Sequence, residues 1–155
     1  MNNWIEALQD RRLKERADEE MQWEKHKLAV QSTPALADLL KKQIEGDVCE
    51  FQKRFTGDRI ELVSPSPSGA DVRVRTQRFP LRMVEYKVGE GQLQYLKFYQ
   101  KSCDAQLASD QKGTVLIKAD FNGSRWFEHQ GEKILTVPEL SSMLLAEVFE
   151  DASLP

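Results

Sequence analysis

The hydrophobic period of the sequence changes at Gly57. Before this glycine, apolar residues recur every three or four positions, at Leu36, Leu40, Ile44, Val48, Phe51 and Phe55. This spacing is typical of a helix that buries one face. After Gly57, apolar and polar residues alternate, which is typical of strands. Because 155 residues lie within the range of one domain, we expect helix and strands to share a single core.

Strands are predicted at 59–64, 70–76, 79–88, 92–100, 114–121, 124–129 and 133–135, with a polar connection over 102–112. Gly89-Glu90-Gly91 and Asn122-Gly123 are typical hairpin turns. Thr136 begins a T-x-x-E capping box that predicts a terminal helix. The sequence therefore predicts an α+β fold, an antiparallel meander sheet of six or seven strands covered by helices, with a long polar N-terminal helix.

The first 31 residues predict a separate, strongly polar helix. Gln31-Ser32-Thr33-Pro34 indicates a break, with Thr33 as N-cap and Pro34 in the first turn of a second helix that continues to Phe55. We therefore expect an arm over 1–31, one α+β domain over 33–150 and a frayed tail over 151–155. Trp4 and Trp23 are candidate binding residues, because a large ring on so polar a helix rarely lacks a partner.

The strands at 79–88 and 92–100 carry apolar residues on both faces. Met83 and Val84 are adjacent, as are Tyr95 and Leu96. A sheet with one solvated face alternates more cleanly than this. We therefore expect the second face to be covered by the N-terminal helix, by a second subunit or by a ligand. Tyr95 and Tyr99 are candidate contact residues on this aromatic sheet.

An arginine-rich strand is the main sign of nucleic-acid binding. The formal net charge is −3, yet residues 59–101 hold eight basic and four acidic side chains. Arg73, Arg75 and Arg82 could form a cationic stripe that contacts phosphates. The alternative is a solvated sheet face with cross-strand ion pairs, which stabilise little.

One short pattern suggests catalysis. Asp71 on one strand and Glu85 and Lys87 on the next give the order D…E-x-K. This resembles the restriction-endonuclease-like superfamily, and the resemblance implies that these residues hold Mg²⁺ and orient a water. The chain departs from that pattern, because Ala70 stands where proline usually precedes the first acid and a hairpin follows Lys87 instead of a helix. The alternative is a charged pair on a strand.

The sequence offers few residues for a metal, phosphate or dinucleotide site. His26, Cys49, Cys103 and His129 lack the spacing of a zinc site, and no phosphate or dinucleotide loop is present. We therefore expect no metal and no cofactor. The longest apolar runs are far from the roughly 20 residues of a membrane span. Two cysteines and a polar start favour a cytoplasmic protein.

These observations favour a non-enzymatic binding domain. We expect it to self-associate through its N-terminal helix and aromatic sheet face, as a homodimer or with another protein. The alternative is a nucleic-acid-binding protein that uses the arginine-rich strand, with a Mg²⁺-dependent nuclease as its catalytic version.

Overall fold

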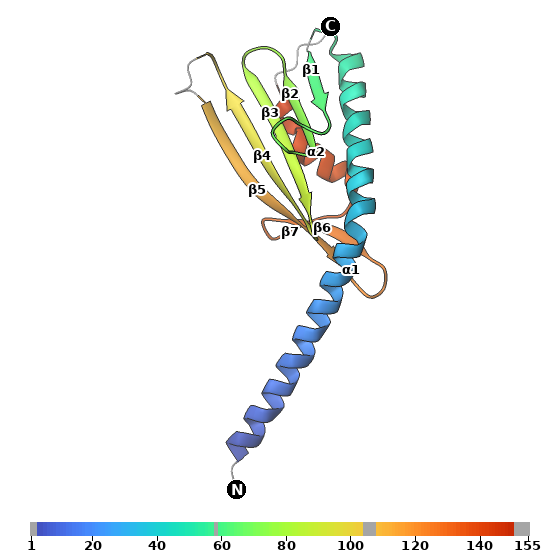
Figure 1. Ribbon diagram of the computed structural model, residues 1–155, viewed down its shortest axis with the longest axis vertical. Helices are drawn as coiled ribbons and strands as arrows, with labels where there is room; N and C mark the ends of the chain where they lie inside the picture. Colours follow the sequence, from blue (N-terminus) through green and yellow to red (C-terminus); the bar gives the residue numbers. More distant parts are fainter. Residues whose placement is uncertain (1–2, 58, 104–107, 151–155) are drawn as a thin grey trace.

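The computed structural model describes residues 3–57, 59–103 and 108–150. Its elements are α1 (Asn3–Arg54), β1 (Ile60–Val63), β2 (Val72–Thr76), β3 (Leu81–Gly89), β4 (Gln92–Gln100), β5 (Ala108–Ala119), β6 (Arg125–His129), β7 (Glu132–Ile134) and α2 (Val137–Phe149). The strands form one seven-stranded antiparallel sheet in sequence order (Figure 1). The predicted α+β meander is confirmed.

The register of the strands decides which side chains share a face. Tyr86 pairs with Tyr95 and Leu93 with Val115, so these four buried residues lie on the same side of the sheet. Gly91 closes the β3–β4 hairpin with a φ of 71°, a conformation that glycine adopts without strain. Tight turns of this kind fix the register along the meander.

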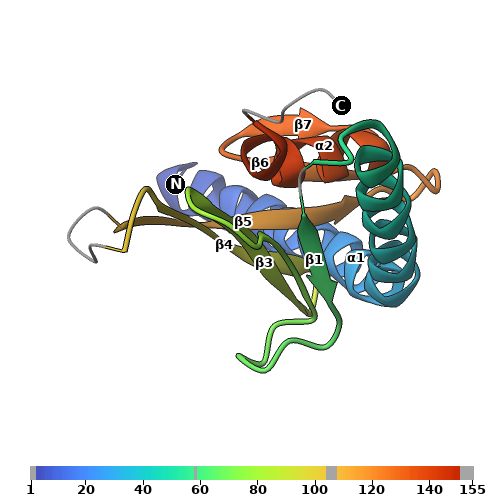
Figure 2. The ribbon, with the colours of Figure 1, turned by 90° about the horizontal axis from the view of Figure 1, so that it is seen from above.

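Both helices cover this buried face, as Figure 2 shows from above. The C-terminal half of α1 contributes Leu40 and Ile44 to the core, and α2 contributes Leu140, Leu144 and Leu145, each at most 2 % exposed. Thr136 is the N-cap of α2 and accepts a hydrogen bond from the backbone N–H of Glu139 (3.3 Å), which confirms the predicted helix start.

The predicted break between two N-terminal helices is wrong. α1 runs unbroken for 52 residues with Pro34 inside it, and it changes direction near its middle (Figure 1). Pro34 lacks the N–H that would bond the carbonyl of Val30, and tertiary contacts hold the helix together there instead. Thr33 does not act as an N-cap. Its hydroxyl donates to the carbonyl of Ala29 (2.9 Å) and accepts from the N–H of Gly91 (3.2 Å).

The expected polar connection over 102–112 is also partly wrong. β5 begins at Ala108, and its first residues extend the pairing with β4, where Ala108 lies opposite Gln100. These positions are mostly polar and exposed, so the hydrophobic period that identifies strands is missing. The tail predicted at 151–155 lies outside the described residues.

The N-terminal helix does not cover the second sheet face, contrary to one of our expectations. Residues 3–24, called the arm below, extend away from the sheet and beyond its end (Figure 1). Every arm residue is exposed except Leu8, which is half-buried. None of the described helices is long and apolar enough to cross a membrane.

Candidate functional site: the arm and the two faces of the sheet

The arm presents large apolar side chains without cover from its own domain. Trp4 is 69 % exposed, Trp23 59 %, Leu13 57 % and Met21 49 %. The aromatic and cation–π contacts of Trp23 within the described residues are with its own helix: His26 lies at 5.8 Å between ring centroids and the Lys27 ammonium 5.6 Å from its ring. Both predicted tryptophans are therefore free to meet a partner.

Two of the predicted arginines are neutralised by acids on neighbouring strands. Arg73 Nε lies 3.1 Å from Glu85 Oε2, in a pair whose side chains are only 20 % and 15 % exposed. Arg75 lies 3.2 Å from Glu61. These are the cross-strand pairs of the alternative interpretation, and they leave little free positive charge on β2 for a phosphate backbone.

Arg82 does not join the other two arginines. Arg75 lies opposite Met83 in the register, so Arg82, one residue away, points to the other face of the sheet. There its guanidinium donates to the carbonyl of Glu150 and lies 5.4 Å from the centroid of the Tyr99 ring. The predicted stripe through Arg73, Arg75 and Arg82 is therefore split between two faces.

The predicted tyrosines lie on the helix-covered face. Tyr95 is 4 % exposed, and its hydroxyl is 2.6 Å from Nε2 of His129. Burial, together with the nearby carboxylate of Glu147, raises the pKa of Tyr95 above its usual value. Tyr95 is thus a core residue whose ring is buried. This corrects its prediction as a contact residue. Tyr99 is half-buried.

Tyr99 borders a groove that the sequence did not indicate. The groove, of about 370 Å³, lies between β3–β5 and the C-terminal end of α2, and it is lined by Arg82, Lys97, Tyr99, Gln111 and Glu147 among others. The Lys97 ammonium donates to the carbonyl of Met143 (2.8 Å) and pairs with Glu147 (3.1 Å). A lysine at an inward position of β4, between Tyr95 and Tyr99, is the sequence signal that could have indicated this site.

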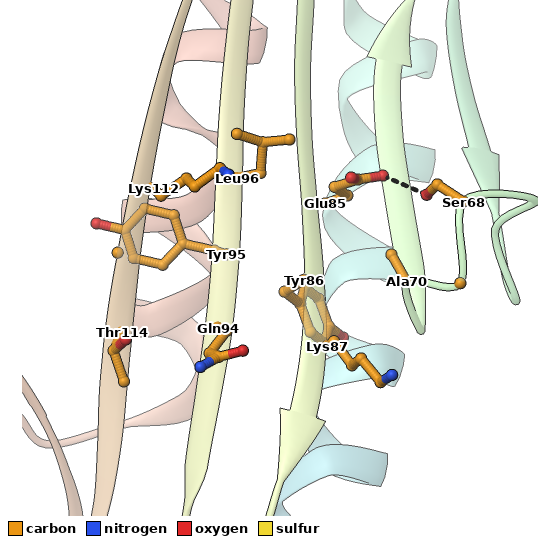
Figure 3. A pocket seen from close by; sticks show the side chains of 12 residues that line it. Ser68, Ala70, Glu85, Tyr86, Lys87, Gln94, Tyr95, Leu96, Lys112 and Thr114 are labelled. Atoms are coloured by element: carbon orange, nitrogen blue, oxygen red, sulfur yellow. Dashed lines mark hydrogen bonds between the residues drawn. The ribbon is translucent and has the colours of Figure 1, made fainter.

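The uncovered face carries a shallow depression of about 560 Å³, which contains two of the three D…E-x-K residues (Figure 3). Glu85 lines it, but its carboxylate accepts from Ser68 (2.8 Å) as well as Arg73. Asp71 accepts from the backbone N–H of Val88 (2.7 Å), and Lys87 is exposed. Both carboxylates thus stabilise the protein's own loops and strands.

Within the described residues, no group of three or more His, Cys, Asp or Glu side chains is placed to hold a metal ion. A D…E-x-K centre would require Glu85 to exchange Arg73 and Ser68 for a cation. The geometry therefore fits the charged-pair interpretation better than the nuclease.

Comparison with known proteins adds no family: no family model, no curated protein and no solved structure matches this chain. The residues and their geometry carry the functional argument alone.

Proposed function

We propose that this protein is a non-catalytic interaction module that associates with a second copy of itself, with the arm as its main contact surface. The observation that carries this proposal is a helix of 22 residues, about 33 Å long, that stands clear of its domain with Trp4, Leu13, Met21 and Trp23 about half or more exposed. Helices in water gain most of their stability from packing an apolar face, and this one packs against no other element in the described part of its own chain.

The uncovered sheet face is the second contact surface of the proposal. Apolar side chains from β3 and β4 remain half-buried there with no helix above them, namely Leu81, Met83, Leu96 and Phe98. Such a patch is typical of an interaction surface. The ion pairs of Arg73 and Arg75 favour a protein over a nucleic acid as the partner.

The mass of the full chain in solution tests the proposal. Light scattering after size exclusion, over a dilution series, should give twice the 17.8 kDa of one chain. A variant that removes the apolar character of the arm (Trp4→Ser, Leu13→Ser, Met21→Ser and Trp23→Ser together) should run as a monomer that keeps the far-ultraviolet circular dichroism of a folded chain.

The matched control changes two apolar residues that are as exposed but lie outside the arm. Phe121 is 56 % and Leu135 64 % exposed, and Phe121→Ser with Leu135→Ser should leave the dimer intact. A monomeric wild type at every concentration would refute the proposal. Excess absorbance at 260 nm that high salt removes would point to nucleic acid instead.

A further inference from the structure

Charge in the arm is divided into two blocks around Ala17. Residues 10–16 hold four basic side chains and two acidic ones, and residues 18–24 hold four acidic side chains and no basic one. Arg11 and Glu15 form an ion pair at 3.9 Å within the first block. Lys14, Arg16, Asp18 and Glu20 form no ion pair with the described residues of this chain, although all four are exposed.

The order of the blocks weakens pairing within the helix: Arg11 and Glu15, which do pair in this order, are 3.9 Å apart, close to the limit of about 4 Å for an ion pair. An i,i+4 pair is favoured when the acid precedes the base, and here bases precede acids. Lys14 with Asp18 and Arg16 with Glu20 both have the less favourable order. These charges are therefore better satisfied by another chain.

Three apolar residues of the arm are also arranged around Ala17. Leu13, Ala17 and Met21 follow each other at four-residue steps, so they lie within about 80° of one another around the helix. Leu13 and Met21 are equally far from Ala17, one on each side. The small side chain of Ala17 allows a second helix to approach closely at the middle of this seam, within the usual 8–10 Å between packed helices.

We infer that two copies of the chain pair their arms antiparallel about a two-fold axis at Ala17. This inference rests on the self-association proposed above and specifies its geometry. Leu13 then packs against the partner's Met21, Met21 against the partner's Leu13, and the two Ala17 residues meet at the axis. The interface is isologous, as expected for a closed dimer.

The charges on the two sides of the seam select this direction. Lys14 and Asp18 lie on one side, and Arg16 and Glu20 on the other, each about 60–100° from Ala17. A two-fold axis perpendicular to both helices keeps like sides together, so Lys14 meets the partner's Asp18 and Arg16 meets the partner's Glu20. Arg16 and Asp18 lie next to the axis and also meet their own copies, so each side has two attractions and one repulsion. Parallel pairing in register brings opposite sides together. It would place Lys14 against the partner's Arg16 and Asp18 against the partner's Glu20, which are repulsive, with one attraction on each side between Arg16 and Asp18.

The domain does not obstruct this seam. Gly91 in the β3–β4 hairpin approaches α1 at His26, where an added Cβ would lie 3.3 Å from Cε1. His26 lies about 180° around the helix from Ala17, so the seam faces away from the sheet. Trp4 and Trp23 lie about 140° and 120° from Ala17 and remain outside the seam.

Thiol crosslinking distinguishes the two directions. Cys49 and Cys103 are free and exposed, so both are first changed to Ser in the full chain. L13C and M21C are then prepared separately, mixed, and treated with a short bis-maleimide. Antiparallel arms predict covalent dimers in the mixture and few in either variant alone, whereas parallel arms predict covalent dimers in each variant alone.

A charge variant gives an independent result. Asp10 and the partner's Glu24 fall together in the antiparallel seam, and both are acidic. Asp10→Lys should therefore tighten the dimer about fivefold, while Asp10→Asn should tighten it less. In parallel arms Asp10→Lys would place two lysines together and gain no partner acid.

The outcomes separate the two proposals. A dimer by mass that crosslinks as L13C with L13C would overturn the antiparallel inference and leave self-association in place. A dimer by mass with crosslinks in no combination would place the interface on the sheet and also overturn it. A monomer at every concentration would overturn both.

Discussion

Replacing Gly113 by alanine tests the assignment of Tyr95 to the core. Gly113 lies directly opposite Tyr95 in the β4–β5 register. A Cβ added to Gly113 would lie 2.6 Å from Cε1 of the Tyr95 ring and closer still to Cζ and Oη. The ring fills the space that a side chain would occupy, so Gly113→Ala must displace a residue that is 4 % exposed.

The cost of this displacement has two parts. Overpacking a core costs about 1–3 kcal/mol, and the hydrogen bond between Tyr95 and His129 contributes about 1 kcal/mol. We expect Gly113→Ala to lower the free energy of unfolding by about 3 kcal/mol. For a chain of this length that corresponds to a melting temperature lower by about 10 °C, measurable by circular dichroism and urea titration.

Two controls make this result specific. Gly46 lies within α1 and an added Cβ meets nothing within 4 Å, so Gly46→Ala should stabilise the protein by about 1 kcal/mol. In a Tyr95→Ala background the cost of Gly113→Ala should disappear, because the ring that blocks the new methyl group is gone. An equal cost in both backgrounds would refute the reasoning.

Two further predictions concern buried polar groups. Tyr86 is 3 % exposed, and its hydroxyl has no hydrogen-bond partner within the described residues; burial first, then Asp71 and Glu45, raise the pKa of Tyr86 above its usual value near 10. A raised folded-state pKa gives stability that is complete below pH 10 and falls as pH rises further. Tyr86→Phe should therefore be at least as stable as wild type at pH 8 and lose less stability between about pH 10 and 11, and identical pH slopes in urea titrations would contradict this. Ser141 is fully buried and donates a hydrogen bond to Asp47 Oδ2 (2.6 Å), so Ser141→Ala should lower the free energy of unfolding by about 1–3 kcal/mol. Ser142 is exposed, and Ser142→Ala should lower it by less than about 0.5 kcal/mol. Equal effects at the two serines would contradict a stabilising role for the Ser141–Asp47 hydrogen bond.

Local patterns were sufficient to predict most of the fold. Hydrophobic alternation identified the strands, Gly91 and the Asn122-Gly123 pair identified hairpins, and Thr136 identified the start of α2. Each of these signals depends on residues within a few positions of one another. The sheet order followed because short turns leave consecutive strands adjacent.

The candidate site was harder to predict because it depends on which face of the sheet each side chain occupies. Pro80 interrupts the alternation between β2 and β3, so the sequence does not show that Arg82 lies on the opposite side from Arg73 and Arg75. The same uncertainty affected Tyr95, whose burial follows from its pairing with Tyr86 and Gly113. A register error of one residue exchanges the two faces of a strand.

α1 is continuous, whereas the sequence predicted a break at Thr33 and Pro34. This difference shows how tertiary contacts override a local signal and create the surface proposed for function. Thr33 and Pro34 are a good helix start when considered alone, but Gly91 donates to Thr33 and Arg125 donates to Ser32, from 58 and 93 residues away. These contacts hold the backbone helical through Pro34, so the docked half of α1 serves as a nucleus from which the arm extends at no further nucleation cost. Only in one continuous helix do Leu13, Ala17 and Met21 acquire a fixed direction relative to the sheet, facing away from it. The charge pattern around Ala17 is present in the sequence, but its orientation outward, where a second chain can reach it, depends on the contacts at Ser32 and Thr33.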